Sequence, residues 1–300
     1  VRRRLLGLPV TSRRMTLGAS LLLFAYYAAT MSRSISLYDS PALALVAEQF
    51  GLGHPFGQPL HTVLGGLAAR IPGVDPLIAL NGLSALASAL TVIPATSFAE
   101  ALLRPSQGFP EGDPRFVAPT VALLGVHPAL WEPATRIEVY PLATFFALWA
   151  GARFVHAILE PNEGKAPFFS TGLALGLSGS VNIICAAGVA IALLPRWLIA
   201  VFRKELSAAS FASAVAGGLL GLLPYAYVFL VAGKTDVFVW GAPTNADAIL
   251  HYFSGKDFAY KGVESFSEWV DHVGEILGWS MSNGLLGVWV VGFAGYALFA

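Results

Sequence analysis

The sequence predicts an all-α polytopic membrane protein with about seven or eight transmembrane helices. Of its 300 residues, 56% are hydrophobic and only 12% are charged, about half the charged share of a typical soluble domain. The apolar residues gather in long uncharged runs, and a helix needs about 20 such residues to cross the hydrocarbon core. These runs do not alternate apolar and polar residues as barrel strands do, so we expect helices, which satisfy their own backbone polar groups.

Six complete runs, taken in chain order, are the candidate spans. A seventh begins near Ile276 and is still apolar at Ala300, so we expect one transmembrane domain over residues 1–300 that is truncated inside a helix. The lone cysteine, Cys185, lies inside a run and allows no intramolecular disulfide. The complete runs cover residues 15–31, 76–99, 116–131, 139–159, 166–195 and 207–233.

The run over residues 166–195 is too long for one span. As a single helix it would measure about 45 Å, against about 30 Å for the hydrocarbon core. We expect a broken pair of short helices that turns near Ser178-Gly179-Ser180, because such breaks are tolerated where protein or a cavity covers them. This pair brings the number of segments to eight and keeps Arg196 on the same side as Arg153.

The basic residues predict the orientation. Arginines precede the first run at positions 2, 3, 4, 13 and 14, so the positive-inside rule places that end in the cytoplasm. Most of the 18 basic residues then lie inside, and most of the 18 acidic residues lie outside. The net charge of zero gives no indication of a nucleic-acid partner. We therefore expect the functional face to be the non-cytoplasmic one.

Two outward segments are long enough to carry function. In residues 32–75, Ser40-Pro41 is typical of a helix start, and glycines at 51 and 53 would end that helix. A second short amphipathic helix over about 60–71 would lie along the membrane surface. The other segment, residues 234–275, is richer in charged and aromatic residues, which suits an interfacial position.

An ordered set of motifs lies in and around these outer segments. Tyr38-Asp39-Ser40, followed by the stretch Gly53-His54-Pro55-Phe56-Gly57-Gln58-Pro59-Leu60, resembles a family of bacterial membrane proteins formerly of unknown function. That family is related to protein O-mannosyltransferase-like transmembrane proteins. Further similarities follow in order at Asn81-Gly82-Leu83, Glu138-Val139-Tyr140, Leu222-Leu223-Pro224-Tyr225 and Val239-Trp240-Gly241.

The resemblance implies a membrane-embedded glycosyltransferase of the C superfamily in a bacterial inner membrane. Such an enzyme moves a sugar, mannose or a similar hexose, from a polyprenyl-phosphate donor to a protein or glycan acceptor on the outer face. We expect no cofactor beyond that lipid-linked donor, and the sequence does not decide whether a divalent metal is needed. The superfamily's essential acidic residue in the first outer loop corresponds to Asp39. The family's second carboxylate is absent, because Pro41-Ala42 replaces Gly-Glu.

Each candidate residue has a structural alternative. Asp39 would act as general base toward an acceptor hydroxyl, or it would only cap the helix that follows. His54 would bind the donor phosphate or the acceptor, or it would be an ordinary loop residue, and the resemblance adds Gln58. His54 and His61 do not form a convincing metal pair, because Pro55, Gly57 and Pro59 lie between them.

Three further candidates are Arg136 and Glu138, at the outer end of the fourth expected span, and Trp240, in the second outer segment. Arg136 matches phosphate oxygens and would hold a lipid phosphate, and Glu138 joins it through the resemblance, although both would also fit a snorkelling ion pair at a helix end. Trp240 would stack on a sugar ring or anchor at the interface. No phosphate-binding loop, dinucleotide fingerprint or Ser/His/Asp signature is present. A lipid or solute transporter or flippase, or an inactive membrane assembly protein, remains the alternative to a transferase.

Overall fold

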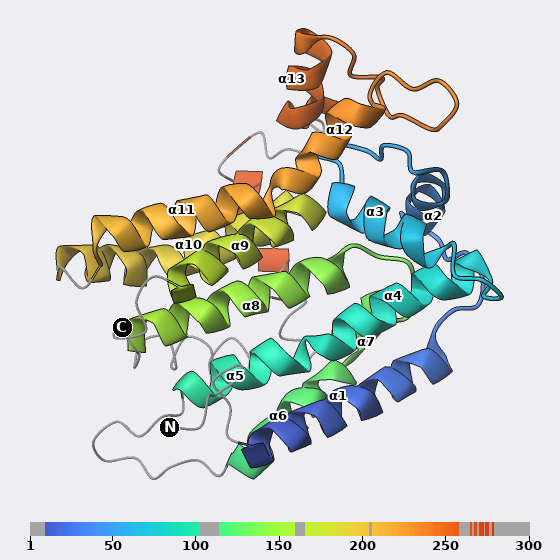
Figure 1. Cartoon of the computed structure of the whole chain (residues 1–300). Coiled ribbons are helices and arrows are strands. Elements are labelled where there is room, and N and C mark those ends of the chain that lie inside the picture. The colour runs from blue at the N-terminus through green and yellow to red at the C-terminus, as the bar shows by residue number, and fades with distance from the viewer. Residues whose placement is uncertain are drawn as a thin grey trace.

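The computed structural model describes residues 10–102, 114–159, 166–203 and 206–257, with scattered positions between 265 and 278. These parts are helical and contain no strand, which confirms the all-α class. Figure 1 shows long helices side by side in a tilted bundle, with α2, α3, α12 and α13 near one end. The elements are α1 (Val10–Thr30), α2 (Ser40–Gln49), α3 (Pro59–Ala68), α4 (Pro76–Leu90), α5 (Val92–Leu102), α6 (Pro114–Gly125), α7 (Pro128–Ala134), α8 (Tyr140–Leu159), α9 (Ala166–Val181), α10 (Ile183–Phe202), α11 (Ala208–Gly221), the 3-10 helix η3 (Leu223–Tyr225), α12 (Ala226–Val231) and α13 (Ala246–Ser254).

Four helical stretches in the described part are long and apolar enough to cross a membrane, which makes the chain a membrane protein. They are Pro76–Ala101, Tyr140–Leu159, Ile183–Phe202 and Ala208–Val231. The expected count of seven or eight spans is not confirmed and stays a prediction. The seventh run, 276–300, lies outside the described residues.

The run over residues 116–131 is not one helix, and this part of the prediction was wrong. The apolar stretch is divided between α6, which has 12 residues, and α7. The division falls at His127, whose ring nitrogen Nδ1 accepts a hydrogen bond from Ala129 N and so caps α7. A 12-residue helix is shorter than the roughly 20 residues that a full crossing requires.

The run over residues 166–195 is broken into two helices, as predicted, but at a different residue. Ser178, Gly179 and Ser180 lie within α9, and the break is at Asn182. The Asn182 side-chain oxygen accepts hydrogen bonds from Ile184 N and Cys185 N, because a capping side chain satisfies the free N–H groups of the helix that begins there. The second helix, α10, has 20 residues and is therefore not short.

Glycines let α9 and α11 pack backbone against backbone. A Cβ atom on Gly172 would lie 1.8 Å from the carbonyl oxygen of Ala214, and one on Gly176 would lie 2.3 Å from that of Gly218. Gly217 and Gly221 on α11 show the same proximity to α9, with hypothetical Cβ distances of 2.1 and 2.4 Å. Small residues four apart on each helix are typical of close helix packing in membranes.

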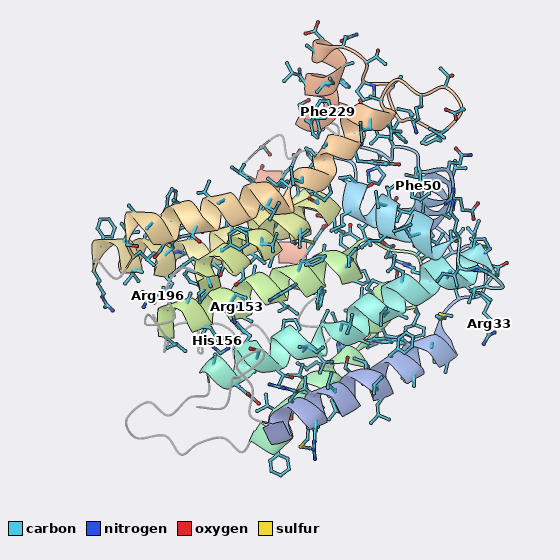
Figure 2. The ribbon with its side chains drawn as sticks, in the orientation of Figure 1. Arg33, Phe50, Arg153, His156, Arg196 and Phe229 are labelled. Carbon is cyan, nitrogen blue, oxygen red and sulfur yellow. The ribbon has the colours of Figure 1, made fainter. Side chains whose placement is uncertain are left out.

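The two ends of the bundle carry different residues. Figure 2 shows Arg153, His156 and Arg196 near one end, and Arg33 and Phe50 at the other. This arrangement agrees with the sequence-based assignment of Arg153 and Arg196 to one side. Which end faces the cytoplasm stays a prediction.

The first outer segment folds back onto the bundle. Helices α2 and α3 form as predicted, although α3 begins and ends earlier than the expected 60–71. Leu43 and Ala47 of α2 share a buried cluster with Leu80 of α4 and Leu142 of α8. This packing fixes both ends of α2, and the candidate residues lie just beyond those ends.

Candidate functional site

The two outer segments pair with each other through the backbone. Leu52 N donates a hydrogen bond to Phe238 O at 2.8 Å, and Trp240 N donates one to Leu52 O at 3.0 Å. The Gln49 side-chain oxygen accepts a further bond from Phe238 N at 2.7 Å. These backbone bonds join the two outer segments, which are far apart in the sequence, into one cap over the end of the bundle.

The start of α2 is tied to the segment that precedes α8. The Ser40 hydroxyl is fully buried and donates to Ile137 O at 2.9 Å. Ser84 of α4 bonds both backbone atoms of Glu138, accepting from its N–H at 3.2 Å and donating to its carbonyl at 3.3 Å. Three elements therefore hold Asp39 and Glu138 beside each other, although 99 positions separate them.

Asp39 precedes α2 without capping it. It occupies the N-cap position, but its backbone is helical and its side chain accepts no hydrogen bond from the helix. The Asp39 side chain is exposed, and its charge acts on Glu138 and Tyr140. The capping alternative therefore does not describe the Asp39 carboxylate, which is available for other contacts.

Arg136 holds the second carboxylate of this region. Its Nε lies 3.1 Å from an oxygen of Glu138, and its Nη1 lies 2.8 Å from an oxygen of Glu132. The ring of Tyr38 covers the guanidinium at 5.3 Å. We call Tyr38, Asp39, Glu132, Arg136 and Glu138 the Asp39 cluster. Glu132 was not singled out from the sequence, although its spacing from Arg136 is that of an ordinary helical ion pair.

Glu138 is almost completely buried beside the exposed Asp39. Its side chain is only 4% exposed, and its Oε2 has no hydrogen-bond partner. Burial raises the pKa of Glu138 above 4.5, and the charge of Asp39 raises it further, while Arg136 acts in the opposite direction. The structure therefore places two carboxylates, Asp39 and Glu138, beside each other.

A second set of polar side chains lies where the two outer segments meet. His54 Nδ1 is 3.4 Å from Gln58 Nε2, and the His54 ring meets the ring of Trp240 edge-on, with centroids 6.3 Å apart. The indole N–H of Trp240 donates to Asp257 at 3.0 Å, and His251 Nε2 is 2.6 Å from the other oxygen of Asp257. We call these five residues the His54 cluster.

The His54 cluster contains two residues that the sequence did not indicate, His251 and Asp257. The hydrogen bond from Trp240, followed by that from His251, lowers the pKa of Asp257, so this carboxylate is ionised at neutral pH. Trp240 carries an oriented hydrogen bond in addition to its ring contact, which a simple interfacial anchor would not require. No local sequence signal links Asp257 to His54, because their proximity depends on the pairing of the outer segments.

The structure divides the six candidate residues between two places. Asp39, Arg136 and Glu138 lie at the first end of α2, whereas His54, Gln58 and Trp240 lie beyond its other end. A ten-residue helix such as α2 is about 15 Å long. One small group cannot contact both clusters, but an extended molecule that lies along α2 can reach each of them.

His61 on α3 is a buried histidine that faces no solvent. It is 2% exposed, its Nε2 has no hydrogen-bond partner, and burial lowers its pKa from 6.5 to about 4. In the described residues no group of three His, Cys, Asp or Glu side chains is suited to a metal ion. His61 is therefore a neutral packing residue in this structure.

Acid should destabilise the fold through His61. Between pH 6.5 and 4 the unfolded chain binds a proton that the folded His61 does not, so stability falls as the pH decreases, by about 3 kcal/mol at most. We expect the melting temperature of the detergent-solubilised His61→Gln variant to fall less over this range than that of the parent protein. His272 is exposed, so His272→Gln is the control variant. Equal acid sensitivity of His61→Gln and His272→Gln would contradict this prediction.

The apolar spans and the polar clusters at one end of the bundle define a polytopic helical membrane protein with a polar cap. The sequence profile described as the protein O-mannosyl-transferase TMEM260 N-terminal domain matches residues 39–210, more than half of the chain. The chain therefore belongs to this protein O-mannosyltransferase family. No curated protein and no solved structure matches it. The matched region begins at Asp39 and includes every candidate except Trp240.

Proposed function

We propose that this protein is a glycosyltransferase of the membrane-embedded C superfamily, built as one transmembrane domain. It transfers mannose or a similar hexose from a polyprenyl-phosphate donor to a hydroxyl of a protein or glycan acceptor. The reaction takes place at the non-cytoplasmic face of a bacterial inner membrane. Family membership supports the reaction class, and the observation that carries the assignment of the site is the Asp39 carboxylate, which does not cap its helix.

The Asp39 cluster has the groups that this transfer requires. As the acceptor oxygen bonds to the anomeric carbon of the sugar, Asp39 takes the hydroxyl proton. The bond between that carbon and the donor phosphate oxygen breaks, and the polyprenyl phosphate leaves with the electron pair. Arg136 stands beside Asp39 with 22% of its side chain exposed, and its guanidinium fits the departing phosphate.

Glu138 adjusts the charge around this reaction. Because its pKa is raised, Glu138 retains a proton to a higher pH than an ordinary glutamate. Arg136 lies 3.1 Å from Glu138 and balances its charge, so the second carboxylate beside Asp39 is not left as an uncompensated negative charge. This arrangement favours binding of an anionic donor near a carboxylate base.

The His54 cluster is suited to hold a sugar or glycan away from the reacting bond. The Trp240 ring supplies an apolar face, and His54, Gln58 and Asp257 supply hydrogen-bonding groups around it. With α2 about 15 Å long between the clusters, an acceptor would extend from the His54 cluster toward Asp39. This geometry favours an elongated acceptor over a single small alcohol.

The direct test is sugar transfer by the purified full chain in lipid nanodiscs. A radiolabelled polyprenyl-phosphate mannose and a set of peptide and glycan acceptors are supplied, and labelled acceptor is measured. Transfer that needs both substrates supports the proposal. Failure to label any acceptor, with the donor shown to bind, would favour a non-enzymatic role.

Sidedness is tested by cysteine labelling in a Cys185→Ala background. Leu37 is 80% exposed beside Asp39, and Phe202 is 82% exposed at the opposite end of the bundle. In intact cells an impermeant maleimide should label Leu37→Cys, and it should label Phe202→Cys only after the membrane is permeabilised. The reverse pattern would place Asp39 in the cytoplasm and overturn the proposed active face.

A further inference from the structure

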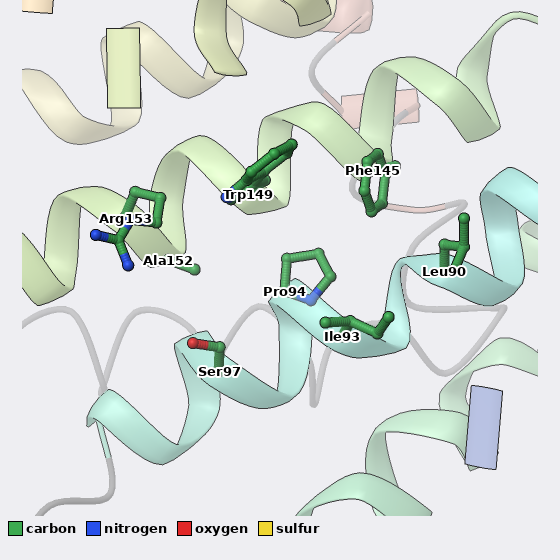
Figure 3. A pocket seen from close by; sticks show the side chains of 8 residues that line it. All are labelled: Leu90, Ile93, Pro94, Ser97, Phe145, Trp149, Ala152 and Arg153. Carbon is green, nitrogen blue, oxygen red and sulfur yellow. The ribbon is translucent and has the colours of Figure 1, made fainter. Parts of the chain in front are cut away.

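A narrow apolar slot lies between α5 and α8, far from both polar clusters. Figure 3 shows Phe145, Trp149 and Arg153 along α8, facing residues of the α4–α5 stretch across the opening. The slot has a volume of about 200 Å³. The α5 wall consists mainly of Ile93, Pro94 and Ser97.

Arg153 is the charged residue among those that line the slot. Its side chain is half-buried, and its Nε donates a hydrogen bond to the Ser170 hydroxyl of α9 at 2.9 Å. Within the described part of the chain, no carboxylate lies within ion-pair distance of Arg153. A guanidinium carries five N–H donors, and among the described residues only the Nε donor is used, by Ser170, so the other donors can bind a ligand.

The polar side chain opposite Arg153 in the slot is that of Ser97, and it already has a hydrogen-bond partner. The Ser97 hydroxyl is 3.1 Å from His156 Nε2, and both side chains are buried. The rest of the wall is hydrocarbon or aromatic, with the rings of Phe145 and Trp149 5.9 Å apart. A sugar or peptide would leave its polar groups unpaired here, whereas a hydrocarbon chain would not.

An apolar slot with a cation at its end suits a molecule that has both a hydrocarbon chain and an anionic group. A phosphate accepts two parallel hydrogen bonds from a guanidinium, and an acyl chain fills apolar space. The volume is below the roughly 300 Å³ of pockets that hold drug-sized ligands, so it fits part of one chain. We propose that this slot holds an acyl chain of an anionic phospholipid whose headgroup phosphate is bound by Arg153.

This lipid site is distinct from the proposed donor site. Thirteen positions of α8 separate Tyr140 from Arg153, a distance of about 20 Å along the helix axis, two thirds of the roughly 30 Å hydrocarbon core. Arg196 lies at the same end of the bundle as Arg153 (Figure 2). A phosphate bound at Arg153 therefore lies toward the membrane face opposite the Asp39 cluster, and the inference does not depend on the transferase proposal.

Native mass spectrometry of the full chain in detergent tests this site. Phosphatidylglycerol and phosphatidylcholine with identical acyl chains are added in turn, and bound lipid is counted. The parent protein should bind the anionic lipid about 5- to 10-fold more strongly. Arg153→Gln should lose that preference, whereas Arg33→Gln, which removes an exposed arginine at the other end of the bundle, should keep it.

Two further measurements separate the possible causes. Ile93→Trp fills the slot from its half-buried wall and should weaken the binding of both lipids. In the unmodified protein, phosphatidylglycerol with a photoreactive acyl chain should crosslink to α5 and α8. An unchanged preference in Arg153→Gln, crosslinks confined to other helices, or displacement of the lipid by millimolar inorganic phosphate would each overturn the proposal.

Discussion

Replacing Asp39 with asparagine is expected to lower the rate of sugar transfer about 100- to 10,000-fold, the usual contribution of a general base. Asparagine has the shape of aspartate but cannot accept the acceptor proton at neutral pH. Because the Asp39 side chain makes no bond to the helix that it precedes, the melting temperature should not change. Transfer is measured with purified protein at saturating donor.

A matched pair of alanine variants separates catalysis from helix capping. Asp75 precedes α4, and its carboxylate accepts hydrogen bonds from Leu77 N at 2.9 Å and Ile78 N at 3.3 Å. Asp75→Ala should therefore lower stability by about 1 kcal/mol and retain transfer. Asp39→Ala should retain the stability of the parent protein and lose transfer. Normal transfer by Asp39→Ala would remove this residue from the proposed mechanism.

Glu138 should respond differently from its neighbour. Glutamine has the shape of glutamate, and in the proposed reaction the acceptor proton goes to Asp39, so Glu138→Gln should reduce transfer less than Asp39→Asn does. A larger loss in Glu138→Gln than in Asp39→Asn would assign the role of base to Glu138 instead.

The largest effect on stability is expected at the interface of α9 and α11. Gly172→Leu would place a side chain where the carbonyl oxygen of Ala214 already lies, 1.8 Å from the new Cβ. Because that oxygen belongs to the backbone, the two helices must separate. We expect a loss of about 3 kcal/mol, the upper end of the usual cost of overpacking. Gly172→Ala should already lower the melting temperature.

Gly188 on α10 is the matched control for this substitution. A Cβ there meets nothing within 4 Å, so Gly188→Leu should leave the melting temperature of the detergent-solubilised protein unchanged. Separation of α9 and α11 should also reach the cap, because Tyr227 follows α11 and its hydroxyl bonds Phe50 O. Equal melting temperatures for Gly172→Leu and Gly188→Leu would contradict the close packing described above.

Local features of the fold were predictable from the sequence. Ser40-Pro41 marks the start of α2, since proline has no N–H to lose at a helix start and its fixed backbone angle suits the first turn. The length of the run 166–195 against the membrane thickness required a break. The exact residue was not predictable from length alone, because the Asn182 side chain decides it by capping α10.

The arrangement of the candidate site depended on contacts between distant segments. Glu138 lies close to Asp39 because of the Ser40 and Ser84 hydrogen bonds. Nothing in the sequence near Ser40 or Ser84 indicates the distant residues to which these serines bond. The pairing of Leu52 with Phe238 uses backbone atoms that every residue has. By contrast, the glycine spacing at Gly172 and Gly176 was visible in the sequence and would have indicated the α9–α11 contact.

A hydrogen bond joins Gln49 and Phe238, which lie 189 positions apart in the chain. The two outer segments can therefore pair only after Phe238 has been synthesised. A ribosome that adds about 5 to 20 residues per second takes about 10 to 40 s to pass from the first of these residues to the second. During that interval the outer segment that contains Gln49 has no segment to pair with. Its exposed backbone groups would then be open to chaperones or proteases until the later helices have been inserted.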